Sequence, residues 1–245
     1  INFKHKFKNI QLISIISISS LIIFISGERT ALAMLLIFLF IIFMIFKKYQ
    51  KLFIISISIF SCLAMISLIG NSQLKDRILN NTPTQINLDI KNLNINFFSI
   101  QHEVVYQTSF KIIQDNFLFG IGTKMFRVIC KDEKYKTYTK LDGSIDGCQT
   151  HSHNTYIQLL TETGFFGFFI FAILYLYVLY SLLKKIFKPK KEYNDLEVIE
   201  IFCLLSFFIN FWPLMPSGNF FNNWINVLYY LPIAFYLFAK TKKNN

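Results

Sequence analysis

Six apolar stretches divide the chain, and each approaches the length of about 20 residues that a helix needs to cross a bilayer. The run ALAMLLIFLFIIFMIF holds no polar side chain. The first stretch is short and contains serines that can hydrogen-bond between helices, among them Ser14, Ser17, Ser19 and Ser20. The pattern therefore predicts an all-α multi-pass integral membrane protein. The predicted spans cover approximately residues 10–26, 30–46, 52–70, 164–183, 198–214 and 220–239.

A long polar segment, residues 71–163, separates the first three spans (within 1–70) from the last three (within 164–245). Its first part, 71–100, is Asn-rich and reads as irregular, with NNTPTQ as a turn signal. The stretch QHEVVYQTSFKIIQ then predicts an amphipathic helix over 101–114, whose apolar positions are Val105, Phe110, Ile112 and Ile113. The helix ends at DNFLFGIG, where Gly120 and Gly122 permit a tight backbone or a positive φ. Residues 131–147 are charged and loop-like.

Basic residues assign a side of the membrane to each connection. The chain is 53% hydrophobic and carries a formal net charge of +11. Clusters of lysine at 4–8, 47–51, 184–191 and 240–243 all fall on one side of six spans, which the positive-inside rule makes the cytoplasm. The segment 71–163 holds ten Lys or Arg against nine Asp or Glu, so it is nearly neutral. The excess charge is therefore a topology signal, and nucleic-acid binding is not expected.

The start of the chain predicts a membrane helix and not a signal peptide. A basic KHKFK stretch precedes the first apolar run, but no small-residue cleavage site follows it. Because the sequence begins with Ile1 and enters this basic stretch directly, we expect it to be the C-terminal portion of a longer protein.

Two cysteines, Cys130 and Cys148, lie in the long segment, outside the spans. An oxidising compartment would allow them to form a disulfide. Two unpaired thiols are an alternative, and a metal site that uses nearby histidines is another. The metal site is disfavoured because the sequence has no CxxC or HExxH spacing.

The stretch THSHNTYIQLLTETGFFG, residues 150–167, predicts a helix that enters the fourth span. Ser152 is the expected N-cap, with His153 and Asn154 in the first turn. Gly164 can end or bend this helix, and Gly167 allows close packing. His153 is therefore placed at a helix start near the membrane interface, where it is either a hydrogen-bonding interfacial imidazole or a catalytic group.

Arg29 lies in SGERTA, a very short turn between the first two spans, on the same side as His153. Its guanidinium could extend to lipid phosphate or pair with Glu28. Alternatively, its planar fork could bind a pyrophosphate at the membrane surface.

Three elements in order, SGERTALAMLL, DNFLFGIGTKMF and HSHNTYIQLLTETGFFG, resemble the O-antigen ligase and O-antigen polymerase family. The spacing of His153 and Asn154 from Gly164 and Gly167 fits that family's signature, and the resemblance covers roughly 15–185. Family members usually carry more spans, which agrees with a C-terminal portion here.

The resemblance implies a cofactor-free, metal-independent glycosyltransferase with a GT-C-like helical bundle and a large periplasmic loop region. It would lie in the bacterial inner membrane and act at the periplasmic face. The donor would be a glycan linked to undecaprenyl pyrophosphate, and the acceptor would be lipid A core or another glycan. In this picture Arg29 holds the pyrophosphate and His153 is the general base.

Other residues are candidates for substrate binding. Arg127 and Lys124, just after GIG, could contact phosphate, although solvated loop charges are the simpler reading. His151 could orient His153 or meet the acceptor, and Asn154 belongs to the same motif. Three asparagines near the last span could line an acceptor groove or only pack between helices: Asn222, Asn223 and Asn226.

The acceptor is left open by the sequence. A ligase, a polymerase and a protein O-oligosaccharyltransferase would all use the matched residues, and the ligase is our first expectation. A lipid-linked glycan flippase or transporter is the alternative from another class, but it would place polar residues within its spans, where few occur here.

Overall fold

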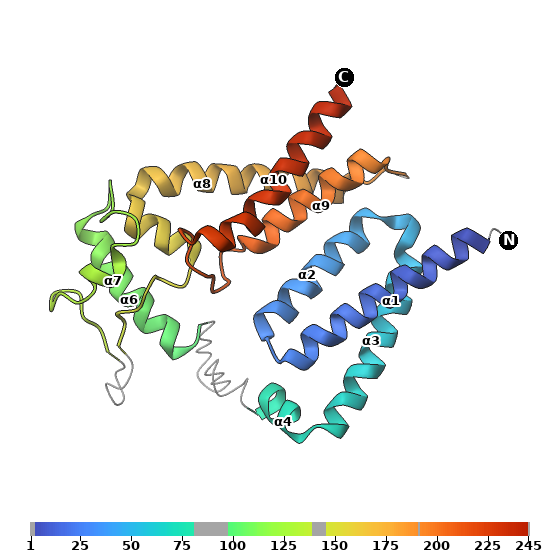
Figure 1. Cartoon of the computed structure of the whole chain (residues 1–245), viewed down its shortest axis with the longest axis horizontal. Coiled ribbons are helices and arrows are strands. Elements are labelled where there is room, and N and C mark those ends of the chain that lie inside the picture. Colours follow the sequence, from blue (N-terminus) through green and yellow to red (C-terminus); the bar gives the residue numbers. More distant parts are fainter. Residues whose placement is uncertain (1–2, 81–97, 139–145, 191, 245) are drawn as a thin grey trace. The chain divides into compact units, whose positions relative to one another are not determined.

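The computed structural model describes residues 3–80, 98–138, 146–190 and 192–244. Regular structure in these ranges is helical, apart from one isolated bridge between Tyr138 and Asp146. The chain forms two compact units, which are considered separately (Figure 1). The first contains residues 1–93 and 183–193, and the second contains 94–182 and 194–245.

The first unit is built from the N-terminal apolar helices. Gly27, with φ +69°, makes the turn between α1 and α2, and α1 packs along α3. The Ser17 hydroxyl donates to the Ser56 carbonyl at 3.1 Å, so a serine of the first span joins two helices as its composition suggested. Phe24, Ala64 and Leu74 form a buried cluster beside the turn. The elements are α1 (Phe3–Ser26), α2 (Arg29–Ile45), η1 (Lys47–Tyr49), α3 (Gln50–Gly70), α4 (Ser72–Lys75) and η2 (Asp76–Asn80).

The second unit has two cores. Val105, Ile112 and Phe126 are buried together with Cys130 within the polar segment. A separate aromatic cluster joins the long helix α8 to the helices after it, with Phe171 4.9 Å from Phe211 between ring centroids. Figure 1 draws α9 and α10 alongside each other, and they pack in contact. The elements are α6 (Ile100–Asp115), α7 (Phe126–Ile129), α8 (Thr155–Phe187), α9 (Asp195–Asn210) and α10 (Asn223–Asn244).

Helices occur at all six predicted spans. Among the described residues, three segments are long and apolar enough to cross a membrane, which agrees with a membrane protein. They are Lys8–Ser26, Lys47–Gly70 and Thr155–Phe187. The apolar helix α2 is shorter at 17 residues. The number of crossings and the side on which each loop lies stay predictions.

The polar segment differs from expectation at its start. Residues 72–80 are helical turns instead of irregular chain, because Asn71 caps α4 by accepting from the Leu74 backbone N–H at 3.0 Å. The Asn-rich stretch 81–97 lies outside the described residues. Helix α6 is confirmed and buries Val105, Ile112 and Ile113, whereas Phe110 points outward and is 51% exposed.

Candidate functional site

His153 lies immediately before α8 in a left-handed conformation, with φ 52°. Asn154, and not Ser152, is the N-cap: its Oδ1 accepts from the backbone N–H groups of Tyr156 at 3.0 Å and Ile157 at 3.2 Å. Non-glycine residues seldom adopt positive φ, and such strain concentrates at functional sites. His153 is therefore held just outside the helix by its backbone.

The loop between α9 and α10 fixes this backbone from the other side. The Ser217 N–H donates to the His153 carbonyl at 2.9 Å, and the Thr155 and Ser217 hydroxyls lie 2.9 Å apart. The Asn154 amide donates to the Pro213 carbonyl at 2.8 Å. Because Asn154 is only 3% exposed and both ends of its amide are engaged, its side chain holds the loop and the helix start together.

Two further imidazoles surround the His153 ring. The ring centroid of His151 lies 4.1 Å away, and that of His102, from α6, lies 5.7 Å away. Burial lowers the pKa of His153, so its neutral form, which can accept a proton, is favoured at pH 7. The pKa values of His102 and His151 are also lowered, chiefly by burial and secondarily by the charge of His153.

Hydrogen bonds orient the rings of His151 and His102, and those of His151 also assign its ring proton. Nε2 of His151 lies 3.3 Å from the Ser217 carbonyl oxygen, which only accepts, so Nε2 carries the proton. Nδ1 then accepts from the Thr150 hydroxyl at 2.9 Å. Nδ1 of His102 lies 2.7 Å from the Ser99 hydroxyl, so the helix-capping serine also orients this ring. Sequence reasoning placed His102 on the helix but gave no sign that it meets His153.

The DNFLFGIG and TETGFFG stretches meet through their backbones. Gly164 interrupts α8 with φ 68° and ψ −168°, so the helix bends as expected. The N–H groups of Ile121 and Gly122 donate to the carbonyls of Thr161 at 3.0 Å and Glu162 at 2.9 Å. A Cβ on Gly120 would lie 2.5 Å from the Glu162 carbonyl carbon, and one on Gly164 would lie 2.3 Å from the Leu118 carbonyl oxygen. Both glycines are thus required by close backbone contact.

The remaining predicted glycines are accommodated differently. Gly122 has φ +94° and open space around it, with only the Met125 side chain nearby at 3.4 Å. Gly167 makes room for the Thr163 side chain one turn earlier in α8, because a Cβ there would lie 2.1 Å from the threonine hydroxyl.

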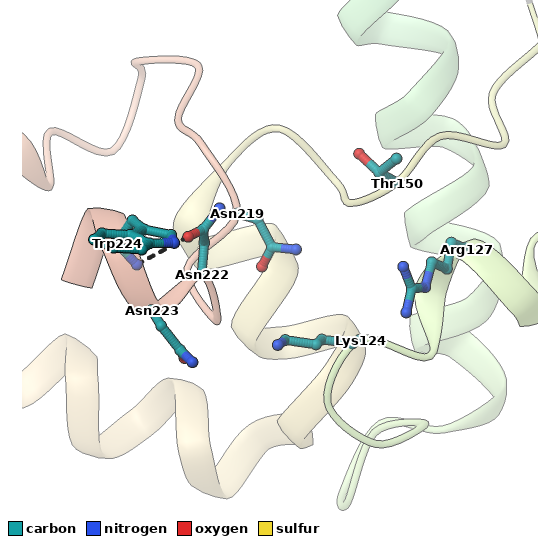
Figure 2. Close-up of a pocket in the computed structure, with 7 residues that line it drawn as sticks. All are labelled: Lys124, Arg127, Thr150, Asn219, Asn222, Asn223 and Trp224. Atoms are coloured by element: carbon teal, nitrogen blue, oxygen red, sulfur yellow. Dashed lines mark hydrogen bonds between the residues drawn. The ribbon is translucent and has the colours of Figure 1, made fainter.

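A cavity of about 320 Å³ lies beside the histidines, within the second unit. It gathers Lys124 and Arg127, two of the predicted binding residues, with Asn222 and Asn223 at the start of α10. Figure 2 shows the Lys124 side chain extending from its turn toward these asparagines. Thr150, Asn219 and Trp224 complete the lining and had no sequence signal as site residues.

The predicted cysteine pair is joined as a disulfide, with the Cα atoms of Cys130 and Cys148 5.1 Å apart. Cys130 is fully buried against Phe126 and Ile112, whereas Cys148 is partly buried at the edge of the same cluster. The link connects the chain after α7 to the loop that leads to Thr150 and His151. Both sulfur atoms are used in the disulfide, so neither is available as a metal ligand.

Arg29 belongs to the first unit and begins α2. Its guanidinium Nη2 donates to the Arg77 carbonyl at 3.1 Å. The ion pair of Glu28 is formed with the Arg77 guanidinium at 3.3 Å. Two guanidinium groups therefore share the SGERT turn, which the sequence alone did not indicate. A common site for Arg29 and His153 stays a prediction.

A family model described as O-antigen ligase matches residues 14–172, which is more than half of the chain. The chain belongs to the O-antigen ligase family. The matched range contains Arg29, His153 and all of the glycines at 120, 122, 164 and 167. Comparison with curated proteins and with solved structures finds no match to this chain.

Members of the O-antigen ligase family are membrane enzymes of the glycosyltransferase or ligase type that act on lipid-linked glycans. The match ends at residue 172, so the loop that fixes His153 and the asparagine side of the cavity lie beyond it. The site of this chain is therefore assembled from a family segment and from a C-terminal segment that the family model does not cover.

Proposed function

We propose that this protein is an O-antigen ligase-type glycosyltransferase that moves a glycan from undecaprenyl pyrophosphate to lipid A core at the periplasmic face of the bacterial inner membrane. The proposal rests on the position and environment of His153. A family-motif histidine is held by its backbone outside a helix, among neutral rings, where burial lowers its pKa. O-antigen polymerisation is the alternative, since it would use the same groups with a lipid-linked glycan as acceptor.

In the reaction, a ring nitrogen of His153 takes the proton from an acceptor hydroxyl as its oxygen attacks the anomeric carbon of the donor sugar. The bond between that carbon and the pyrophosphate oxygen breaks, and the electron pair leaves with the lipid pyrophosphate. Arg29 binds this leaving group and offsets the charge that develops on it. The products are the glycosylated acceptor, the lipid pyrophosphate and a protonated His153, which then loses its proton to solvent.

The neighbours of His153 have supporting roles in this proposal. His151 lies with its ring against that of His153 and is itself fixed by Thr150 and Ser217, so it acts as a positioning residue. Asn154 positions the backbone and does not touch substrate, since its amide is buried and engaged internally.

Substitution of each proposed catalytic residue tests the assignment. His153→Ala should lower turnover about 10²- to 10⁴-fold with donor affinity nearly unchanged, because only a proton acceptor is lost. Arg29→Ala should weaken donor binding as well as turnover, and Arg29→Lys should recover part of both, because a point charge cannot form the bidentate contact.

The assay is transfer from purified lipid-linked glycan to lipid A core, and in parallel to a second lipid-linked glycan. Lys131→Ala, an exposed charge in the same polar segment, serves as the matched control and should keep full activity. Full turnover by His153→Ala would remove the general-base assignment. Transfer only to the second lipid-linked glycan would show that the protein is a polymerase and not a ligase.

A further inference from the structure

The cavity beside the histidines carries two positive charges and no negative one among its lining side chains. Lys124 and Arg127 are exposed, and neither forms an ion pair in the part of the chain that the structure describes. The buried Glu162 side chain accepts the Lys124 backbone N–H at 2.6 Å and also interacts electrostatically with Arg127. That bond fixes the turn, in which Lys124 has φ 62°, so the two cations are presented from a rigid base.

The rest of the cavity wall is neutral, polar and aromatic. Thr150 and the three asparagines offer hydroxyl and amide groups, which both donate and accept hydrogen bonds. Trp224 is 86% exposed, and its large apolar ring can pack against the C–H face of a pyranose. The volume of about 320 Å³ lies at the small end of ligand pockets, which suits one sugar residue.

This wall is preorganised by a buried side chain of α8. Gln158 is fully buried, donates to the Asn219 Oδ1 at 2.8 Å and accepts from the Phe220 N–H at 2.9 Å. Asn222 in turn accepts from the Trp224 backbone N–H at 3.0 Å, as the dashed line in Figure 2 shows. The side chains of Asn219 and Asn222 are therefore fixed by hydrogen bonds, as is the backbone of Trp224, whose ring remains exposed.

The cavity is connected to the proposed base, His153, through Thr150 and His151. Thr150 lines the cavity, and its hydroxyl is 2.9 Å from Nδ1 of His151, whose ring lies 4.1 Å from that of His153. Thr150 and His151 therefore lie between a ligand in the cavity and His153. An occupant that neutralises the two cations is favoured over a neutral one, because charge-assisted hydrogen bonds are about twice as strong as neutral ones.

We infer that this cavity binds one anionic sugar residue, which bears a carboxylate or a phosphate. This sugar belongs either to the donor glycan or to the acceptor, which meet at His153. The inference rests on the proposed function and adds a preference for acidic saccharides. Arg127 and Lys124 bind the oxyanion, the asparagines and Thr150 bind ring hydroxyls, and Trp224 packs on the ring. The two cations, Lys124 and Arg127, lie within the family match, whereas Asn219, Asn222 and Trp224 lie beyond it.

Tryptophan fluorescence of the full chain in lipid nanodiscs tests the inference. A Trp212→Phe variant leaves Trp224 as the only tryptophan, so its emission reports on the cavity. Titration with glucuronate and with glucose 1-phosphate separates carboxylate from phosphate recognition, with glucose as the neutral probe and inorganic pyrophosphate as the sugar-free anion. At least one acidic sugar should bind tenfold or more tightly than glucose and than pyrophosphate.

Variants distinguish this site from its surroundings. Lys124→Ala with Arg127→Ala should weaken binding of the acidic sugar at least tenfold, whereas Lys131→Ala should not change it. Equal binding of glucose and acidic sugars, or an unchanged affinity in the double variant, would overturn the inference. Tighter binding of pyrophosphate than of either acidic sugar would also overturn it, since the cavity would then serve the donor's pyrophosphate.

The outcome is separable from that of the proposed function. His153→Ala should retain acidic-sugar binding while it loses turnover, because the base does not line the cavity. Turnover by His153→Ala would refute the mechanism and leave the sugar site standing. Loss of sugar selectivity with turnover still dependent on His153 would refute only the sugar site.

Discussion

Substitution of Gly164 by alanine should disrupt the contact between the two glycine-containing stretches. The native φ of 68° and ψ of −168° fall in a region that essentially only glycine adopts, and forcing alanine into it costs about 1 to 3 kcal/mol. The added Cβ would also lie 2.3 Å from the Leu118 carbonyl oxygen. Because this oxygen belongs to the backbone, the clash can be relieved only if residues 117–120 move together.

The expected loss of stability follows from these two terms. Overpacking against a rigid neighbour costs about 1 to 3 kcal/mol, so the total is about 2 to 6 kcal/mol. A global stability of about 5 to 15 kcal/mol would be reduced substantially, and the melting midpoint should fall by on the order of 10 °C. Gly120→Ala should have a similar effect, since its Cβ would meet the other side of the same contact at 2.5 Å.

Two glycines provide matched controls for the measurement. Gly70→Ala meets nothing within 4 Å at the end of α3, so its effect should be within about 0.5 kcal/mol. Gly122 has a positive φ but open space around it, so the loss of stability in Gly122→Ala measures the backbone strain without the clash. Thermal unfolding in detergent, followed by intrinsic fluorescence, compares the set. A midpoint for Gly164→Ala within about 2 °C of that for Gly70→Ala would refute the reasoning.

Three further predictions concern protonation, the disulfide and topology. Because burial lowers the pKa of His153 below 6.5, turnover should hold at pH 7 and fall only at pH values below that usual pKa; loss of activity well above pH 6.5 in a pH–rate profile would contradict this. For the same reason the unfolded chain binds more protons below pH 6.5, so melting midpoints should decrease as pH falls through this range. Mass spectrometry of non-reduced peptides should find Cys130 linked to Cys148, and reduction should destabilise the protein by about 3 kcal/mol; two freely alkylated thiols would count against the link. With the two unpaired cysteines removed, an impermeant thiol reagent applied to intact cells should modify Lys131→Cys and spare Lys188→Cys, and the opposite labelling would place His153 in the cytoplasm.

The helices and the family could be predicted from the sequence alone. Long apolar runs can satisfy their backbone in a membrane only as helices, so α1, α3 and α8 were readable from local composition. The backbone conformations at Gly120 and Gly164 could also be predicted, because glycine adopts positive φ at turns and kinks without steric cost, whereas the positive φ of Lys124 and His153 had no such signal. The motif spacing then identified the O-antigen ligase family without any knowledge of packing.

The assembly of the site depends on contacts that only the tertiary structure shows. His102 meets His153 only because α6 packs beside the start of α8, and no local pattern records a contact between residues so distant in sequence. Asn154 replaces Ser152 as the cap because the distant loop at Ser217 fixes His153 in a left-handed conformation before the helix. The cavity likewise combines three segments whose proximity depends on long-range contacts. Local periodicity predicts secondary structure, whereas these contacts are set by packing of the whole unit.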